Sequence, residues 1–569
     1  MIVYGDVATS SSVADLLQKI AARLRQAAAT TGTTRHDLLV AAFIEGSGLA
    51  QGLIDAEFEA AGADDLSPLH AHAMSLLRAL AGGLARDRPQ GEAELATLAL
   101  APLPASVKVR TPEGYAFYAV YPEAYLQAAA SYPWAAAPLV IGLRSIGVGL
   151  AALVGHAAGA DRVISLRPVG PPFARELRLT PNLRSLLATH AGPFAVVDEG
   201  PGLSGSSFGC VADLLEELGV ASERIVFLPS HANDLGPNAH PRHRARWRTA
   251  RRLVRTLDDL LAKDPIGAWF SDVIGETTSV EDLAGGAWRR GWKTGELPPV
   301  YPTGERRKFR LTTGNGRWLA RFAGLGAIGE SKFRQAQALH AAGFTPRPMA
   351  LRRGFLLERW EDGRPLPIRA TSEPGFLDHL GAYIAFRARN FPAAPEEGAS
   401  LEALHEMASV NVPALLGEES GRPVLERLLR HTPRRSLDHR IRVDAKLQAW
   451  EWLRRPDGSF CKLDALDHAR SHDLIGCQEV GWDIAGATAE FQLSPSDVER
   501  LCSAVAASGG RPVDLPTLPF FGICYAAFHG ALWSMAAETA SPAERARTLR
   551  SRAFYQADLA RLAASDTGG

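Results

Sequence analysis

The chain has 569 residues, and its 62 Lys and Arg are balanced by 62 Asp and Glu. This length exceeds what one hydrophobic core organises, so we expect roughly three or four domains. The absence of net charge predicts small-molecule partners, with no nucleic acid or membrane surface, and leaves a homo-oligomer open. The five cysteines show no CxxC spacing, which indicates reduced thiols in a cytoplasmic protein and argues against structural zinc.

The first 90 residues are expected to be helical. Apolar residues recur there at spacings of three and four, as on one face of a helix. The segment Arg86–Gly91 combines charged residues, Pro and Gly, and marks a boundary. We expect a helical region over 1–90 that covers the next domain.

Residues 91–230 alternate apolar strand candidates with helices, the pattern of a mostly parallel sheet. Pro138–Leu150 is expected to form a buried strand, a loop and a helix, and Arg144, Ser145 and Gly147 lie just past the strand. Glycines let the backbone approach a ligand, and a guanidinium can bind pyrophosphate with two hydrogen bonds. Arg144, Ser145 and Gly147 are therefore candidate substrate-binding residues.

A second strand, Phe194–Val197, ends at two carboxylates, Asp198 and Glu199. A loop of small residues and then an amphipathic helix, expected over 208–218, come next. A strand, a Gly/Ser loop and a helix N-terminus place backbone N–H groups and hydroxyls around a phosphate. The acids would face sugar hydroxyls or a Mg²⁺ ion bound to the sugar. The loop residues expected to bind the phosphate are Ser204, Gly205, Ser206 and Ser207.

The stretch Val197–Ser207 resembles the ribose-5-phosphate motif of type I phosphoribosyltransferases, and the region as a whole is similar to the orotate-phosphoribosyltransferase-like proteins linked with bacterial tellurium-resistance clusters. The resemblance implies a parallel-sheet domain, PRPP as substrate and Mg²⁺ as cofactor. It implies that Asp198 and Glu199 are catalytic and hold the ribose hydroxyls, while the Arg144 loop receives pyrophosphate. The spacer of residues 200–203 is one residue longer than the family's usual one.

Residues 231–302 are expected to connect two domains. The run His240–Arg248 is basic and contains one Trp. Such a run fits either a phosphate or nucleic-acid contact or a solvated connector, and zero net charge favours the connector. A Pro-rich segment at 298–302 marks the next boundary.

Residues 303–569 resemble aminoglycoside-phosphotransferase-like kinases. Two strand candidates flank the Asn315–Gly316 turn, and a Gly-rich stretch, a helix and a further strand follow. These elements correspond to the small lobe of such kinases. Arg321 stands where the family has a strand Lys, so the resemblance implies that Arg321 binds a cofactor, ATP.

Further along, the resemblance implies Asp444 as the catalytic base, Asp464 as the Mg²⁺ ligand and Asp483 as a structural residue. The family's metal-binding Asn is missing, and Gln448 or Glu451 are alternatives. A separate metal interpretation is that His468 and His472 share a helix face near acidic residues. It stands beside Mg²⁺ binding by Asp464 alone and beside ordinary solvated loop residues.

The sequence therefore predicts a multidomain α/β and α+β protein, with a helical N-terminal region, a phosphoribosyltransferase-like domain at 91–230, a connector at 231–302 and a two-lobed kinase-like domain at 303–569. We expect an enzyme that exchanges a base and pyrophosphate at ribose C1, using PRPP or a nucleotide. A second, ATP-dependent activity would belong to the C-terminal domain. The alternative is a regulator that senses PRPP or a nucleotide without turnover.

Overall fold

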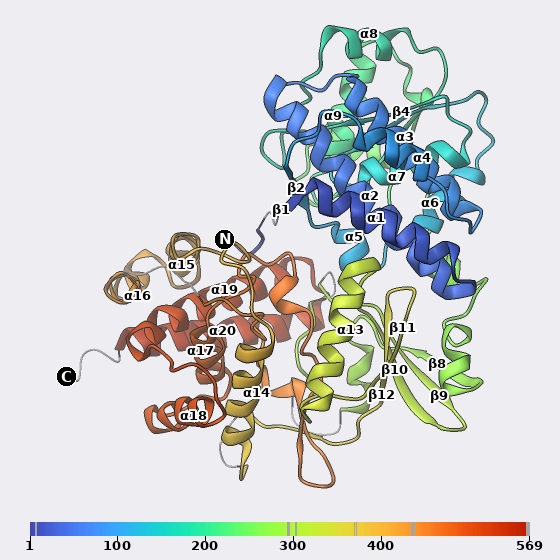
Figure 1. Ribbon diagram of the computed structural model, residues 1–569. Helices are drawn as coiled ribbons and strands as arrows, with labels where there is room; N and C mark the ends of the chain where they lie inside the picture. The colour runs from blue at the N-terminus through green and yellow to red at the C-terminus, as the bar shows by residue number, and fades with distance from the viewer. Residues whose placement is uncertain are drawn as a thin grey trace.

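The computed structural model describes residues 1–5, 8–292, 296–301, 304–368, 370, 373–433 and 439–564. Figure 1 shows an upper part that carries the N-terminal half and a lower part that carries the C-terminal half. Among the described residues, strands form a five-stranded parallel sheet, a five-stranded antiparallel sheet and two smaller antiparallel sheets. This confirms the expected multidomain α/β organisation with a helical N-terminal region.

The N-terminal region packs helix on helix because each helix has a continuous apolar face. In α1, the residues Val13, Leu16, Ile20 and Leu24 recur on one side and are buried, while the Ser12 side chain accepts a hydrogen bond from the Asp15 N–H and caps the helix. The helices of this region are α1 (Val13–Ala28), α2 (Gly32–Ala61), α3 (Pro68–Ala85) and α4 (Glu92–Ala99).

Two helical segments, Gly32–Ala61 and Leu515–Thr539, are long and apolar enough to cross a bilayer by length and composition. Most of the apolar window of each is buried inside the protein. Core helices have this property, so their hydrophobicity is accounted for by packing.

The parallel sheet has the order β4-β3-β5-β6-β7, and every neighbouring pair is parallel. Its strands are β3 (Leu139–Leu143), β4 (Arg162–Leu166), β5 (Phe194–Val197), β6 (Ile225–Leu228) and β7 (Arg251–Arg252). Its associated helices are α6 (Pro122–Ala130), α7 (Gly147–Ala157), α8 (Pro181–Thr189), α9 (Ser206–Glu217) and α10 (Pro241–Thr249).

Both faces of this sheet are buried, which explains the uninterrupted apolar runs of its strands. Val140 and Ala195 pack toward the N-terminal helices, whereas Ile141 and Val196 pack on the opposite face. The strand order reverses between β3 and β5, and ligands of open α/β sheets bind at the carboxyl ends of strands at such a point. The segments after β3 and β5 therefore lie at the expected ligand crevice.

The antiparallel sheet of the C-terminal half has the order β11-β12-β10-β9-β8. It consists of β8 (Thr277–Asp282), β9 (Lys308–Thr313), β10 (Gly316–Phe322), β11 (Pro348–Arg352) and β12 (Phe355–Arg359), with α13 (Gly326–Ala341) packed on it (Figure 1). The hairpin at Asn315–Gly316 joins β9 and β10, as its turn residues predict.

The stretch expected to be a connector contributes to both large sheets. Its β7 joins the parallel sheet and its β8 pairs with β9 in the antiparallel sheet. Its basic run forms α10, where Arg246 pairs with Asp213 and Glu216 and Trp247 is buried. Its other elements are α11 (Leu257–Leu261), η2 (Ala268–Phe270), α12 (Ser271–Ile274) and η3 (Ala287–Gly291).

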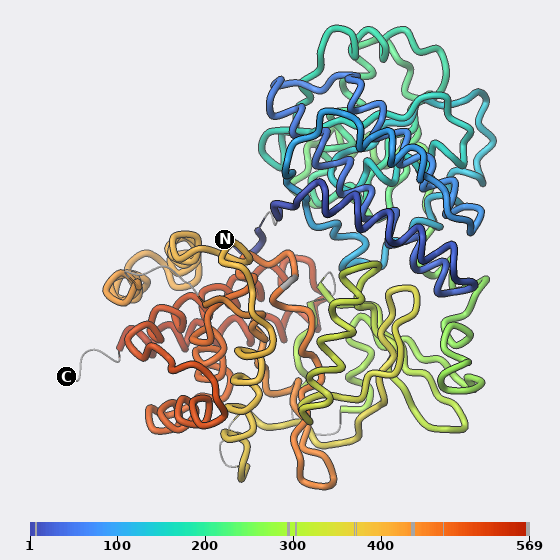
Figure 2. Tube along the Cα trace, viewed as in Figure 1, coloured from blue at the N-terminus to red at the C-terminus, as the bar shows by residue number. Residues whose placement is uncertain are grey.

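The remaining C-terminal residues form a helical lobe. Its elements are β13 (Arg364–Pro365), α14 (Phe376–Asn390), α15 (Leu401–Leu416), α16 (Glu418–His431), η5 (Ala449–Glu451), β14 (Trp452–Arg454), β15 (Phe460–Lys462), η6 (His468–Arg470), α17 (Val480–Glu490), α18 (Pro495–Ala507), η7 (Leu515–Thr517), α19 (Leu518–Thr539) and α20 (Pro542–Ala564). The first residues of the chain lie against this lobe (Figure 2): Val3 is part of its core and the Ile2 N–H donates to Asn411.

A short segment joins the two halves. The strands β1 (Ala8–Ser12) and β2 (Ser106–Arg110) form an antiparallel ribbon, and α5 (Glu113–Ala116) and Phe117 follow. The Phe117 ring contacts the guanidinium of Arg306 and the ammonium of Lys332, which both belong to the C-terminal half. The Leu325 N–H donates to the carbonyl of Tyr115, so α5 also touches the start of α13.

Candidate functional site

Asp483 on α17 fixes the backbone of the loop that carries Asp444. Asp483 lies in the first turn of α17, and its carboxylate oxygens accept the backbone N–H groups of Asp444 and Ala445, each at 2.9 Å. Ala445 adopts a left-handed conformation (φ 64°), which turns the chain sharply after Asp444. One carboxylate that accepts two hydrogen bonds thus fixes the conformation of this loop, the structural role expected for Asp483.

Two side chains of α14 hold the same loop from the other side. Tyr383 donates its hydroxyl to the Asp444 carboxylate. Arg387, one turn later, donates to the carbonyls of Arg442, Val443 and Ala465. The guanidinium therefore ties the Asp444 loop to the segment after β15. The Asp444 side chain is buried.

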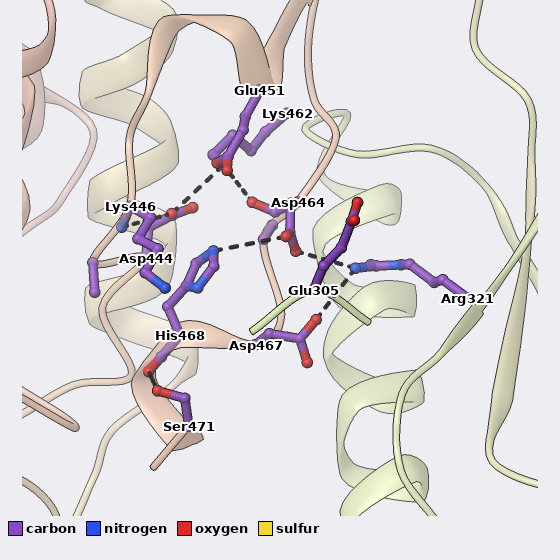
Figure 3. Close-up of polar contacts among 12 residues, drawn as sticks. Glu305, Arg321, Asp444, Lys446, Glu451, Lys462, Asp464, Asp467, His468 and Ser471 are labelled. Carbon is purple, nitrogen blue, oxygen red and sulfur yellow. Dashed lines mark hydrogen bonds and ion pairs between the residues drawn. The ribbon is translucent and has the colours of Figure 1, made fainter. Parts of the chain in front are cut away.

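Asp464, two residues after the end of β15, faces Arg321 of the antiparallel sheet (Figure 3). The Arg321 guanidinium on β10 lies 3.2 Å from Asp464 and 2.8 Å from Glu358 on the neighbouring strand β12. On α13, Lys332 forms a buried ion pair with Asp467. Arg321, at the position where the kinase resemblance expects a strand Lys, thus pairs with a Glu of the neighbouring strand, and the Lys of this region lies on α13.

A second cluster lies beside Asp444. The Lys462 ammonium is 2.5 Å from Glu451 and 3.6 Å from Asp444, and it also contacts the Asp464 carbonyl. Burial raises the pKa of Glu451 to about 8, with Lys462 partly offsetting the effect. Burial lowers the pKa of His468 to about 4, so its imidazole is neutral at pH 7.

The donor set suits a divalent cation. Single ligand atoms of Asp444, Glu451 and His468 lie within 4.8 Å of one another, and His468 is 3.8 Å from Asp464. Carboxylate oxygens are the ligands that Mg²⁺ prefers, and it usually takes one or two from the protein. Glu451, one of the two alternatives to the missing Asn, is part of this cluster.

The N-terminal half brings a second acid pair together. Asp198 and Glu199 follow β5 at the reversal of strand order, and Glu199 accepts the Gly114 N–H at 2.9 Å. The Tyr125 hydroxyl donates to the Asp198 carbonyl at 2.7 Å. Burial raises the pKa of Asp198 to about 7 and that of Glu199 to about 8. Burial thus favours the neutral form of both carboxyls, which can hydrogen-bond to hydroxyl groups.

Two glycines of the loop after the acids adopt the left-handed conformation. Gly202 and Gly205 have positive φ angles of 57° and 63°, and Gly205 precedes the first turn of α9, where no side chain caps the helix. The Ser204 and Ser206 hydroxyls lie 2.9 Å apart, and Ser206 donates to the Pro172 carbonyl at 2.5 Å. Ser207 lies in the first turn of α9.

The two candidate loops of this half touch each other. Gly147 starts α7 so close to β5 that an added Cβ would lie 2.8 Å from the Val197 carbonyl oxygen and 3.2 Å from the Asp198 carboxylate. The glycine is therefore required by the close approach of the loops. Ser145 and Ile146, just before α7, line a cavity of about 990 Å³ that also reaches Ala469 and Ser471 of the C-terminal half.

The Arg144 side chain does not face this crevice. Its guanidinium is buried, lies 2.8 Å from Asp55, pairs with Asp64, and donates to the carbonyl and hydroxyl of Ser165 at 3.1 and 3.2 Å. Arg167 pairs with Asp55 from the other side. The expected pyrophosphate contact by Arg144 stays a prediction, and it would require this buried network to open.

Several residues of the sites are visible only once the chain is folded. No sequence motif marks Tyr383, Arg387, Lys332 or Lys462. The signal that could have found them is a polar residue on an otherwise apolar, buried element. His472 lies outside the cluster that contains His468: its ring stacks on Tyr4 with centroids 4.7 Å apart. The shared helix face expected for the two histidines is replaced by the short 3-10 helix η6.

No protein-family model and no curated protein sequence matches the chain. Among solved structures, choline kinase LicA from Streptococcus pneumoniae is similar over 52% of this chain and 99% of its own, at 15% identity and a TM-score of 0.34. Macrolide 2′-phosphotransferase MphH from Brachybacterium faecium covers 52% of this chain and 96% of its own, at 14% identity and a TM-score of 0.33. A spectinomycin phosphotransferase, in complex with ADP and spectinomycin, covers 52% and 96%, at 10% identity and a TM-score of 0.36.

Proposed function

We propose that the C-terminal half is an ATP-dependent phosphotransferase acting on a hydroxyl group of a small molecule. The observation that carries the proposal is the Asp483 carboxylate, which holds the backbone of Asp444 and Ala445 while Asp464 faces Arg321 across the lobes. Phosphoryl transfer needs positioned charges more than covalent chemistry by the protein. Here cationic side chains and carboxylates lie next to one another, as this reaction requires.

Each residue has a role in this proposal. Arg321 and Lys332 would neutralise phosphate oxygens, after exchanging part of their present contacts with Asp464 and Asp467. Asp464 and Glu451 would hold the divalent cation, which supplies charge neutralisation for the phosphates. Asp444 would orient the acceptor hydroxyl and accept its proton. Because the Asp444 side chain is buried beneath Tyr383 and Lys462, substrate binding requires these side chains to move.

Binding of a fluorescent, slowly hydrolysed ATP analogue tests this proposal. We expect Asp464→Asn to weaken binding strongly, and Asp198→Asn, the matched change of an acid at the other site, to leave it unchanged. Equal loss in both variants, or no binding to the unaltered chain in the presence of divalent cations, would contradict a separate nucleotide site in this half.

For the N-terminal half we propose a site for a ribose 5-phosphate group, with base and pyrophosphate exchange on PRPP as its reaction. Support comes from the contact of Gly147 with Val197 and Asp198, which puts the two loops side by side at the reversal of strand order. Asp198 and Glu199 would bind the ribose hydroxyls. The segment Ser204–Ser207 and the start of α9 would bind the 5′-phosphate.

Turnover distinguishes this enzyme from a PRPP-sensing regulator. Pyrophosphate release from PRPP is measured with a panel of purine, pyrimidine and pyridine bases, alongside PRPP binding by calorimetry. Release with one base, abolished by Glu199→Gln, is expected for the transferase. Measurable PRPP binding with no release for any base would favour the regulator.

A further inference from the structure

An imidazole lies among the acids of the C-terminal site. Figure 3 shows His468 between Asp444 and Asp464, and one ligand atom each from Asp444, Glu451 and His468 falls within 4.8 Å of the other two. The three residues come from separate parts of the lobe: the Asp444 loop, η5 and η6. The folded chain therefore brings three separate segments together at this position.

The ring nitrogen that faces the acids has no hydrogen-bond partner. The His468 Nε2 is buried without one among the residues that the structure describes, and Asp464, at 3.8 Å, is too distant for a hydrogen bond. The side chain is only 10% exposed. A buried polar atom without a partner is costly, and a neutral imidazole nitrogen there is available as a metal ligand.

The surrounding charges leave room for a cation. Five acidic side chains pair here with three cationic ones, and because burial raises the pKa of Glu451 to about 8, a divalent ion would displace its proton on binding. Arg387 and Asp483, which flank Asp444, cancel each other. The five acids are Asp444, Glu451, Asp464, Asp467 and Glu358, and the three cations are Arg321, Lys332 and Lys462.

We propose that Asp444, Glu451 and His468 form a site for a divalent transition-metal ion, of the Zn²⁺ or Co²⁺ class, in preference to Mg²⁺. Imidazole nitrogen favours these ions, whereas Mg²⁺ is bound by oxygen ligands. Three protein ligands with a position left for water or substrate are the arrangement of catalytic zinc sites. The metal site is independent of the proposed phosphotransferase; where both hold, one Asp444 carboxylate oxygen would bind the ion and the other would face the acceptor hydroxyl.

Metal binding is measured directly on the full chain after removal of metals with a chelator. Co²⁺ is added and followed by its visible absorption and by equilibrium dialysis, with Mg²⁺ as competitor. We expect one Co²⁺ per chain, retained against a large excess of Mg²⁺. His468→Gln should weaken Co²⁺ binding by at least about tenfold, the scale seen even for outer-shell changes at metal sites.

Two further variants make the result decisive. Glu451→Gln should weaken Co²⁺ binding as well, while His472→Gln, which changes a neighbouring histidine stacked on Tyr4, should not. Thermal unfolding of each metal-free variant checks that it is folded. Equal Co²⁺ affinity of the His468→Gln and unaltered chains, or no stoichiometric Co²⁺ binding at all, would overturn the proposal.

The outcome is separable from that of the proposed function. If Co²⁺ binds as expected but the ATP analogue does not bind with any cation, the metal site stands and the phosphotransferase falls. If the analogue binds with Mg²⁺ and the His468→Gln change affects neither ion, the phosphotransferase stands and the metal site falls.

Discussion

Replacing Arg144 by Ala should destabilise the N-terminal half, because its guanidinium is part of a buried ion network. The side chain is fully buried, and it contacts both Asp55 and Asp64. Removing one partner of a buried ion pair leaves an uncompensated charge and costs about 3–5 kcal/mol. Since Arg167 still neutralises Asp55, we expect the lower end, about 3 kcal/mol, dominated by Asp64.

Urea unfolding followed by far-UV circular dichroism measures the loss, and hydrogen exchange of peptides covering β3 and β4 localises it. Arg178→Ala is the matched control, because Arg178 is 58% exposed and its ion-pair partner Glu176 is exposed as well. Such surface pairs contribute at most about 1 kcal/mol. The control should therefore unfold almost as the unaltered chain does.

The same variants, titrated with magnesium pyrophosphate, separate the structural role from a ligand role. If Arg144→Ala unfolds like Arg178→Ala but loses pyrophosphate affinity, the guanidinium serves the ligand, and the reasoning from the buried network is refuted.

Three other outcomes follow from the structure. Asp483→Ala should leave the N–H groups of Asp444 and Ala445 without acceptors, costing about 2–6 kcal/mol, with Asp483→Asn intermediate in thermal unfolding. Gly147→Ala should cost about 1–3 kcal/mol and weaken PRPP binding by pushing the two loops apart, whereas Gly314→Ala, with open space around it, should do neither. Burial raises the pKa of Glu490 from its ordinary value of 4.5 to about 7. Ionisation of this carboxyl therefore lowers the free energy of unfolding as the pH rises from 4.5 to 7. Glu490→Gln should therefore gain up to about 3 kcal/mol in urea unfolding above pH 7 and nothing below pH 4.5, and a pH-independent difference would contradict this assignment.

The parallel sheet was predictable because its signals are local. Strands such as Leu139–Leu143 and Phe194–Val197 are short apolar runs, and the acids at 198 and 199 follow directly in sequence. The helix expected from 208 begins at Ser206, because Gly205 takes the left-handed conformation just before it. The left-handed conformation of Gly205 therefore accounts for the two-residue difference in where the helix begins.

The antiparallel sheet was predicted less completely. The pairing of β8 with β9 spans the segment between Asp282 and Lys308, so no turn signal connects them. The Gly-rich stretch, a weak phosphate-binding signal, serves packing: an added Cβ at Gly324 would lie 3.2 Å from the Ala116 carbonyl oxygen, and one at Gly329 would lie 2.0 Å from the Gly324 carbonyl oxygen. Glycines kept for close packing and for ligand binding look alike in sequence.

The partners of the site acids were out of reach for a similar reason. Asp444 and Asp464 stand in a recognisable order, but Tyr383 and Arg387 belong to a helix that ends more than 50 residues before the Asp444 loop. Which cation neutralises which acid is a tertiary property. The pairing of Arg321 with Glu358 and of Lys332 with Asp467 could be read only from the folded chain.

The packing of Ile2 and Val3 against the helical lobe sets a sequence for assembly on the ribosome. Ile2 bonds to Asn411, 409 residues later in the chain. At about 5–20 residues per second, these first residues wait roughly 20–80 seconds for their partner to be synthesised. Ile2 and Val3 are thus synthesised long before the lobe against which they pack.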